Sequence, residues 1–276
     1  MDFTKKLRHI QYKNQSLLCI GLDTDAEKTP RFLRRFRSPQ YEFNRLLIEA
    51  TQDLVCAYKL NLAFYESTGE TGYRTIHRTL AVIPQEIVTI ADGKRGDIGN
   101  TAARYASLIF ENWKFDATTI SPYMGYDSVE PFLKRRDRCA FVLALTSNRG
   151  SRDFQYLSVN GRPLYEHVAR AAGKWNKKRN VGLVVGATHP AELKRIRSHA
   201  REMPILIPGI GAQRGDLQAA VRYGCNAKGE LAVINIGRSI IYASGGKDFA
   251  QKARETAQEY RKQMEAYRKE YFPAGK

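Results

Sequence analysis

Apolar and polar positions divide the chain into two kinds of segment that follow one another in turn. Short apolar runs rich in β-branched residues are typical of buried strands, and longer segments whose apolar residues recur every three or four positions are typical of helices. The predicted strands are 17–23, 55–61, 86–92, 116–120, 139–146, 181–186, 204–208 and 231–237. The predicted helices are 39–54, 67–81, 99–112, 126–136, 162–177, 189–201, 213–223 and 247–270, after a short leading helix over 2–13.

This alternation predicts a parallel sheet whose strands are joined by helices. Eight strand–helix units in 276 residues favour a closed (β/α)8 TIM barrel over an open doubly wound sheet. Because barrels of about 250 residues usually form one domain, we expect an α/β fold with a single barrel domain over residues 1–276. In such a barrel the functional residues lie at the C-terminal ends of the strands.

Polar and charged residues gather where these predicted strands end. They are Asp23 on the first strand, Lys59 and Asn61 on the second, Asp92 and Lys94 at the third, Thr146, Ser147 and Asn148 at the fifth, and Gly237, Arg238 and Ser239 at the eighth. The barrel rule predicts that these side chains share one face of the molecule. The loop over 146–160 is long and polar, and we expect it to be mobile.

The densest group of charges lies in the segment 86–105, EIVTIADGKRGDIGNTAARY. Side chains two apart on a strand share a face, so Asp92 and Lys94 are expected to point the same way. Glycines near Lys94 allow a tight turn, and Asn100 or Asp97 is expected to cap the following helix. Two carboxylates and an ammonium so close together indicate a site. A surface ion pair beside an N-capping aspartate is the alternative interpretation.

The loops after the seventh and eighth strands carry residues suited to phosphate, which barrels often bind at this position. Gly209 and Gly211 leave backbone amides open to an anion. Gln213 offers an amide donor, and Arg238 can grip phosphate with two parallel hydrogen bonds. The alternative is that the glycines only turn the chain and Arg238 is a surface cation. A dinucleotide site is disfavoured, because GIGAQRG is one residue longer than the usual fingerprint.

The chain carries a formal net charge of +17, from 45 Lys and Arg against 28 Asp and Glu. Such an excess steers polyanions or phosphorylated metabolites toward the protein. The basic residues are scattered, however, and the clusters at 31–37, 134–138 and 177–179 each flank a predicted helix, where solvated cations are common. We therefore expect solvated faces at these clusters and no binding of nucleic acid.

The four cysteines, Cys19, Cys56, Cys139 and Cys225, form no CxxC pair. This spacing favours reduced thiols in a cytosolic protein over a disulfide or zinc framework. The N-terminus has no apolar signal core, and no run approaches the roughly 18 apolar residues of a membrane span. We expect a cytoplasmic protein that makes no contact with a membrane.

The segment DGKRGDIGNTAARYA closely resembles the Asp-x-Lys-x-x-Asp signature of the orotidine 5′-phosphate decarboxylase family, in its prokaryotic form with the longer AxKRGDIxxT motif. Four further segments resemble that family in the same order. CIGLD matches its first strand, YKLNLAFYE its second, PGIGAQRGD its phosphate loop and NIGRSII its last strand. Gly93 stands where the family more often has alanine, a conservative difference.

The resemblance implies an enzyme that decarboxylates orotidine 5′-phosphate to UMP and CO2, the last step of de novo UMP synthesis, without a cofactor or metal. The family's charged catalytic tetrad corresponds to Lys59, Asp92, Lys94 and Asp97, with Lys94 as the proton donor to C6. The implied substrate-binding residues are Asp23 on the ribose, Ser147 on the pyrimidine, and Gln213, Gly237 and Arg238 at the phosphate. Asp97, Ile98 and Thr101 would enter the neighbouring subunit's site, so the resemblance implies a homodimer.

Two other functions remain open at this stage. Hexulose-phosphate synthases are similar to this chain in their Asp-x-Lys-x-x-Asp strand and phosphate loops, but they use Mg²⁺ to stabilise an enediolate. A polyanion-binding protein on a catalytically retired barrel is the second alternative, and the net charge of +17 is its support. The intact set of polar strand ends disfavours it.

Overall fold

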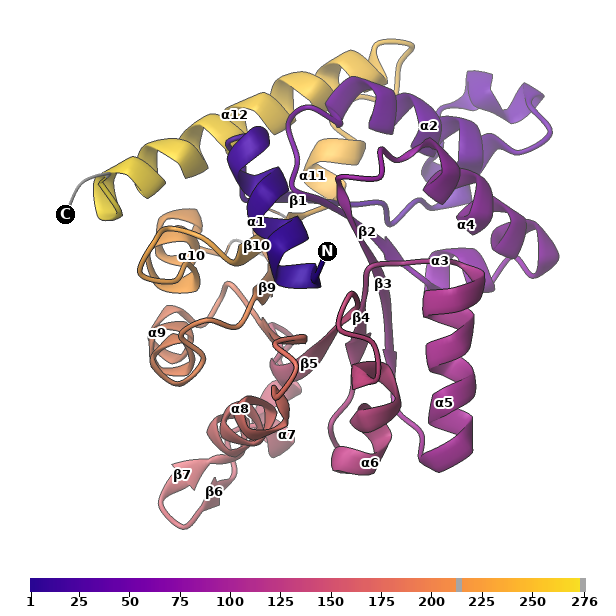
Figure 1. Ribbon diagram of the computed structural model, residues 1–276. Helices are drawn as coiled ribbons and strands as arrows, with labels where there is room; N and C mark the ends of the chain where they lie inside the picture. Colours follow the sequence, from indigo (N-terminus) through magenta and orange to yellow (C-terminus); the bar gives the residue numbers. More distant parts are fainter. Residues whose placement is uncertain (212–214, 274–276) are drawn as a thin grey trace.

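The computed structural model describes residues 1–211 and 215–273, and within them eight parallel strands close into a barrel (Figure 1). The order around the barrel is β1-β10-β9-β8-β5-β4-β3-β2. The strands are β1 Leu18–Gly21, β2 Ala57–Asn61, β3 Val88–Arg95, β4 Ala117–Ile120, β5 Cys139–Leu145, β8 Val181–Val185, β9 Ile205–Pro208 and β10 Ala232–Ile236. The predicted (β/α)8 TIM barrel is confirmed.

Helices surround the strands on the outside of the barrel (Figure 1). The longer ones are α2 Pro39–Thr51, α4 Glu70–Val82, α5 Gly99–Ser107, α8 Leu164–Trp175, α9 Pro190–His199, α10 Leu217–Gly224 and α12 Phe249–Tyr271. Short helices are α3 Ala63–Glu66, α6 Tyr126–Val129, α7 Ser151–Phe154 and α11 Arg238–Ile241. Three 3-10 turns, Ala26–Lys28, Arg31–Arg35 and Glu130–Leu133, and one π-helical turn, Leu108–Asn112, complete the set within the described residues.

The strands are buried on both faces, which is why they read as nearly continuous apolar runs. Every residue of β8 and β10 is buried. The last helix, α12, turns four residues inward along one face: Phe249, Ala253, Ala257 and Met264. The ring of Phe249 stacks on that of Phe43 from α2, with centroids 4.9 Å apart. The outer helices therefore pack on each other as well as on the barrel.

The leading helix, α1 (Phe3–Lys13), covers the N-terminal ends of the strands. Phe3 packs edge-to-face on Phe141 of β5. The side chain of Gln11 donates a 2.7 Å hydrogen bond to the carbonyl of Ala232, at the first residue of β10. Figure 1 shows α1 lying across the barrel. The opposite end, where the strands finish, is left open for a site.

The end of β3 differs from the prediction. The strand does not stop at Asp92 but continues to Arg95, and its register against β4 shifts between Ala91 and Arg95. Lys94 itself adopts a left-handed backbone conformation, with φ +47°. Neither Gly93 nor Gly96 adopts this conformation. A non-glycine residue held at positive φ is uncommon and is often found at functional positions.

The start of α5 also differs from the prediction. Its N-cap position is Ile98, which makes no side-chain capping bond. Neither Asp97 nor Asn100 caps the helix, and the Oδ1 atom of Asp97 instead accepts a 2.8 Å hydrogen bond from the Ile98 amide. The predicted helix over 99–112 keeps its α form only to Ser107, because its last turn widens into the π-helical turn.

Two other predicted elements are shorter in the structure. The helix over 126–136 divides into α6 and a 3-10 turn, because Pro131 lies at the beginning of that turn and lacks an amide hydrogen. The helix over 162–177 begins at Leu164, since Arg162–Pro163 forms strand β7 and pairs antiparallel with β6, Ser158–Val159. The loop expected to be mobile thus contains α7 and a hairpin.

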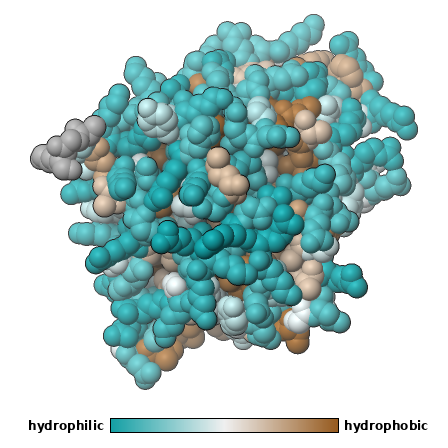
Figure 2. Space-filling model, in the orientation of Figure 1, coloured by the Kyte–Doolittle hydropathy of each residue, from teal (hydrophilic) through white to brown (hydrophobic). Residues whose placement is uncertain are grey.

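The surface agrees with the expectation of solvated basic clusters. The arginines of 31–37 and the basic residues of 134–136 and 177–179 are exposed. Arg138 differs, because its guanidinium lies 3.5 Å from the buried carboxylate of Asp116. Figure 2 shows a largely hydrophilic face with scattered apolar side chains. All four cysteines are buried free thiols. No helix in the described part of the chain is long and apolar enough to cross a membrane.

Candidate active site

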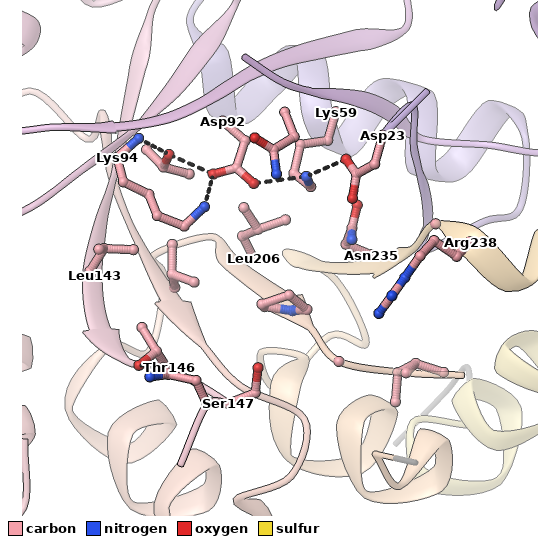
Figure 3. Close-up of a pocket in the computed structure, with 18 residues that line it drawn as sticks. Asp23, Lys59, Asp92, Lys94, Leu143, Thr146, Ser147, Leu206, Asn235 and Arg238 are labelled. Carbon is pink, nitrogen blue, oxygen red and sulfur yellow. Dashed lines mark hydrogen bonds and ion pairs between the residues drawn. The ribbon is translucent and has the colours of Figure 1, made fainter. Parts of the chain in front are cut away.

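A cavity of about 330 Å³ opens at the C-terminal ends of the strands (Figure 3). This volume lies at the lower end of the range typical of small-molecule sites. Its lining comes from both halves of the chain: Asp23, Lys59, Asn61, Asp92, Lys94, Thr119, Leu143, Thr146, Ser147, Asn148, Val184, Leu206, Pro208, Gly209, Ile210, Asn235, Gly237 and Arg238. The predicted gathering of polar strand ends is confirmed for every residue named in it except Ser239, which does not line this cavity.

Four charged side chains form a continuous chain of contacts along one wall (Figure 3). The Lys94 ammonium lies 2.7 Å from Oδ1 of Asp92, and the Lys59 ammonium lies 2.8 Å from Oδ2 of the same carboxylate. Lys59 also lies 3.4 Å from Oδ1 of Asp23. Opposite charges therefore alternate from Lys94 to Asp23, and each anion contacts a cation.

Burial and charge act in opposite directions on the inner pair, Lys59 and Asp92. Burial disfavours the ammonium of Lys59, but the carboxylates of Asp92 and Asp23 outweigh burial and raise its pKa. Burial also disfavours the carboxylate of Asp92, but the ammonium groups of Lys59 and Lys94 hold its pKa below its usual range. Both groups are therefore charged at neutral pH.

Strand geometry explains why these residues meet. Lys59 and Asn61 are two apart on β2, so they point to the same side. The register pairs Asn61 with Asp92 on β3. On β4, the hydroxyl of Thr119 donates a 2.8 Å bond to Oδ1 of Asp92 and accepts a 2.9 Å bond from the backbone amide of Lys94. Thr119 thus connects the carboxylate to the left-handed turn.

Arg95 points away from the cavity and anchors the end of β3 on the outer helices. Its guanidinium pairs with the carboxylate of Glu66 on α3 and lies 4.9 Å from the ring centroid of Tyr105 on α5. Adjacent residues of a strand face opposite sides, which separates Arg95 from Lys94. These contacts hold the backbone on which the Lys94 side chain is placed.

The rest of the cavity is chemically different from the charged wall. Leu143, Val184 and Leu206 come from β5, β8 and β9 and supply apolar surface suited to the face of a flat ring. Thr146 and Ser147 lie across the cavity from Asp92 and Lys59 (Figure 3). Polar groups thus meet an apolar surface at this side, as expected for a site that holds a heterocycle.

A third region of the cavity has the features of an anion site. Gly209 adopts φ 108° in the turn after β9, a conformation that favours glycine. Arg238 is exposed, begins α11 and points into the cavity (Figure 3). A Cβ atom on Gly237 would lie 3.3 Å from the Gly21 carbonyl oxygen, so the backbone of β1 passes close by. Figure 3 shows Arg238 and Lys94 at opposite ends of the cavity.

The structure brings together most of the residues predicted to form the site: Asp23, Lys59, Asp92, Lys94, Ser147, Gly237 and Arg238. Asp97 does not line the cavity of its own chain, so the ring of charges expected to include it is incomplete here. Ile98 and Thr101 are exposed and also lie outside the cavity. Gln213 lies outside the described residues.

Sequence reasoning missed two polar residues of the cavity, Thr119 and Asn235. Both lie on strands that were predicted, Thr119 in β4 and Asn235 in β10. Their positions near the C-terminal ends of the strands could have identified them. Thr119 is the residue before the last one of β4, and Asn235 lies two positions before Gly237, so by the period of two it shares that residue's side of the strand. Asn61 was noted as a strand-end residue but was not assigned to the site.

The donor set of the cavity differs from that of a metal centre. Within residues 1–211 and 215–273, no group of three or more His, Cys, Asp or Glu side chains is arranged to hold a metal ion. The carboxylates of Asp23 and Asp92 both face the ammonium of Lys59. A cation is therefore already present between them.

Comparison with known proteins gives consistent results. The model of the family "Orotidine 5'-phosphate decarboxylase / HUMPS family" matches residues 16–256. The chain is 50% identical over 259 residues to an orotidine 5'-phosphate decarboxylase of Dehalococcoides mccartyi, covering 92% of this chain and 94% of that protein. It is 49% identical over 255 residues to the Herpetosiphon aurantiacus protein of the same name, with the same two coverages.

Solved structures agree in fold. Leishmania donovani OMP decarboxylase superposes with a TM-score of 0.83 at 38% identity, over 97% of this chain and 99% of that one. Leishmania donovani UMP synthase superposes with a TM-score of 0.87 at 40% identity, over 97% of this chain and 57% of that one. The matched family model covers more than half of the chain, and the two bacterial relatives align along 94% of their own length. The chain therefore belongs to the orotidine 5′-phosphate decarboxylase / HUMPS family.

Proposed function

We propose that this protein converts orotidine 5′-phosphate to UMP and CO2, as a carboxy-lyase in the last step of UMP synthesis. The observation that carries the proposal is the Lys94–Asp92–Lys59–Asp23 chain of ionic contacts, whose inner pair Asp92 and Lys59 is buried, in one cavity with Arg238 at the far end. The names of relatives about half identical over most of both chains support the same reaction.

The roles of the charged residues follow from their positions. The carboxylate of the substrate sits against the ionised Asp92, and two like charges about 4 Å apart repel by about 4 kcal/mol at an effective dielectric constant of about 20. As the bond between C6 and the carboxylate carbon breaks, CO2 leaves and its electron pair remains on C6. The fixed ammonium of Lys94 stabilises this charge.

Lys94 then donates a proton to C6, which forms the new C–H bond of UMP and leaves a neutral amine. The Lys94 side chain is 48% exposed, so solvent can return the proton. Lys59 has only 4% of its side chain exposed and lies between two carboxylates. It is therefore suited to keep Asp92 charged and in place rather than to exchange protons. No cofactor or metal takes part in this scheme.

Binding energy comes from parts of the substrate that do not react. Asp23 and Lys59 bind the ribose hydroxyls, and Ser147 binds the pyrimidine. Arg238, Gly237 and the amides around Gly209 hold the phosphate, and the family resemblance adds Gln213, which lies outside the described residues. Interactions with this remote phosphate stabilise the transition state, because they close the site around the substrate and align its reacting carbon with Lys94 and Asp92.

The active form that we propose is a homodimer in which Asp97, Ile98 and Thr101 complete the neighbour's cavity. Ile98 is 52% exposed, and the loop after β4 exposes Tyr123 and Met124 beside it in the fold. The two loops are adjacent, since a Cβ atom on Gly96 would lie 3.7 Å from the Met124 methyl group. Exposed apolar surface of this kind is typical of protein interfaces.

We further propose that residues 1–276 act as one barrel domain in the cytoplasm. The helix α1 begins before the matched family region and still packs onto the barrel through Phe3 and Gln11. The four buried free thiols fit a reducing compartment.

The reaction is tested by incubating the protein with orotidine 5′-phosphate and following the loss of its absorbance, with UMP and CO2 measured as products. Equal amounts of UMP and CO2 are expected. Formation of a hexulose phosphate from formaldehyde and a pentulose phosphate would instead favour the related lyases. Salt-sensitive RNA binding without turnover would favour the polyanion-binding function.

A further inference from the structure

The segment between β5 and α8, residues 146–163, begins with Thr146, which directly follows β5 and is held by several hydrogen bonds. The backbone amide of Thr146 donates a 2.8 Å hydrogen bond to Oε1 of Gln155, which follows α7. Nε2 of the Gln155 side chain donates a 2.8 Å bond back to Oγ1 of Thr146. One side-chain amide thus holds both the backbone and the side chain of the residue before Ser147.

A second contact comes from the beginning of α9. Nε2 of His189 lies 3.2 Å from the carbonyl oxygen of Thr146, and since a carbonyl only accepts, Nε2 carries the hydrogen. The hydroxyl of Tyr156 lies 3.2 Å from Nδ1 of the same ring and donates a 3.0 Å bond to Glu192. His189 therefore holds Thr146 through Nε2, and Thr146 is bound at its amide, hydroxyl and carbonyl.

The third contact is steric. A Cβ atom on Gly186, the residue directly after β8, would lie 2.9 Å from the N, Cα and Cβ atoms of Ser147. Real Cβ atoms essentially never approach so closely, so any side chain at this position would displace Ser147. The Gly186 amide also donates a 2.8 Å bond to the Leu145 carbonyl, which fixes the strand ends against each other.

We infer that Gln155, Gly186 and His189 form a clamp that positions Ser147 against the base of the nucleotide. The inference rests on the proposed function, in which Ser147 binds the pyrimidine. Thr146 and Ser147 lie on the wall opposite Asp92, while Arg238 occupies a separate end of the cavity (Figure 3). The clamp therefore sets affinity for the base and leaves the grip on ribose and phosphate unchanged. Its members are positioning residues, because they act through Ser147.

The test compares the binding of UMP and ribose 5-phosphate to the whole protein by calorimetry. Gln155→Met keeps the length of the side chain and removes every hydrogen bond that this side chain makes to Thr146. UMP affinity is expected to fall about tenfold, the size of one to two net hydrogen bonds, while ribose 5-phosphate affinity stays unchanged. Gln251→Met, the same substitution on the exposed face of α12, is the control and is expected to change neither affinity.

A double-mutant cycle separates positioning from general damage. In the Ser147→Ala background, Gln155→Met should have little further effect on UMP affinity, because the residue through which it acts is already truncated. Gly186→Ala should show the same selective loss of UMP affinity, so the test does not depend on one variant folding. Equal losses for both ligands, or fully additive effects with Ser147→Ala, would overturn the clamp. Failure of the proposed function would appear separately, as absence of orotidine 5′-phosphate turnover by the unmodified protein.

Discussion

Replacing Lys59 by Met should destabilise the barrel as well as inactivate it. Lys59 lies between Asp23 and Asp92 with 4% of its side chain exposed, and its ammonium is 2.8 Å from Asp92. Removing one partner of a buried ion pair costs about 3–5 kcal/mol. The lower end, about 3 kcal/mol, applies here because Lys94 still contacts Asp92.

The assay is thermal unfolding followed by circular dichroism. With a shift of about 2–4 °C per kcal/mol for chains of roughly this size, Tm should fall by about 6–12 °C. Lys252→Met is a matched control, because it breaks a pair of almost equal N–O distance, 2.7 Å to Glu255, on an exposed surface. Little change in Tm is expected for the control.

The pKa shifts also determine how the stability difference between the unmodified protein and Lys59→Met depends on pH. The pKa of Lys59 is raised in the folded protein, so its contribution is complete below the unfolded value and is lost only at strongly alkaline pH. The pKa of Asp92 is lowered, so its contribution is complete above the unfolded value of about 3.9 and is lost as pH falls below it. The unmodified protein should thus exceed Lys59→Met in stability by a constant amount near neutral pH, and this excess should shrink in acid. A variant as stable as the unmodified protein would refute this reasoning.

Three further predictions concern catalysis. Lys94→Ala should abolish turnover without unfolding the protein; near-normal loss of orotidine 5′-phosphate absorbance would remove Lys94 from the role of proton donor. Mixing inactive Asp97→Ala and Lys94→Ala subunits should restore activity, because one site of a mixed dimer then carries neither lesion; no recovery after verified subunit exchange would contradict a shared site. Arg238→Met should raise KM for orotidine 5′-phosphate by about 100-fold, from the loss of charge-assisted bonds, and leave the slow turnover of unphosphorylated orotidine unchanged; an equal effect on both substrates would place Arg238 outside the phosphate site.

The barrel and its charged wall could be predicted because both follow from simple periodicities. The alternation of strand and helix patterns predicted the fold, the period of two placed Asp92 and Lys94 on one face, and the rule for barrel strand ends placed Lys59 beside them. The two residues that these patterns missed, Thr119 and Asn235, are neutral and lie inside strands, where they resemble core positions.

Features made by contacts between distant segments could not be predicted. His189 meets Thr146 across 43 positions of sequence, and Gln155 lies in a loop without any periodicity. The left-handed turn falls on Lys94 rather than on a neighbouring glycine, because Thr119 and Arg95 hold that backbone from other elements. Local propensity contains none of this information.

The most direct test of the central claim, that fixed charges alone drive the loss of CO2, is turnover of orotidine 5′-phosphate by protein dialysed against a chelator. UMP should form at the same rate before and after dialysis, and added Mg²⁺ should not change it. Loss of activity that returns with Mg²⁺ would contradict the claim, because the Lys94–Asp92–Lys59 chain would then not suffice.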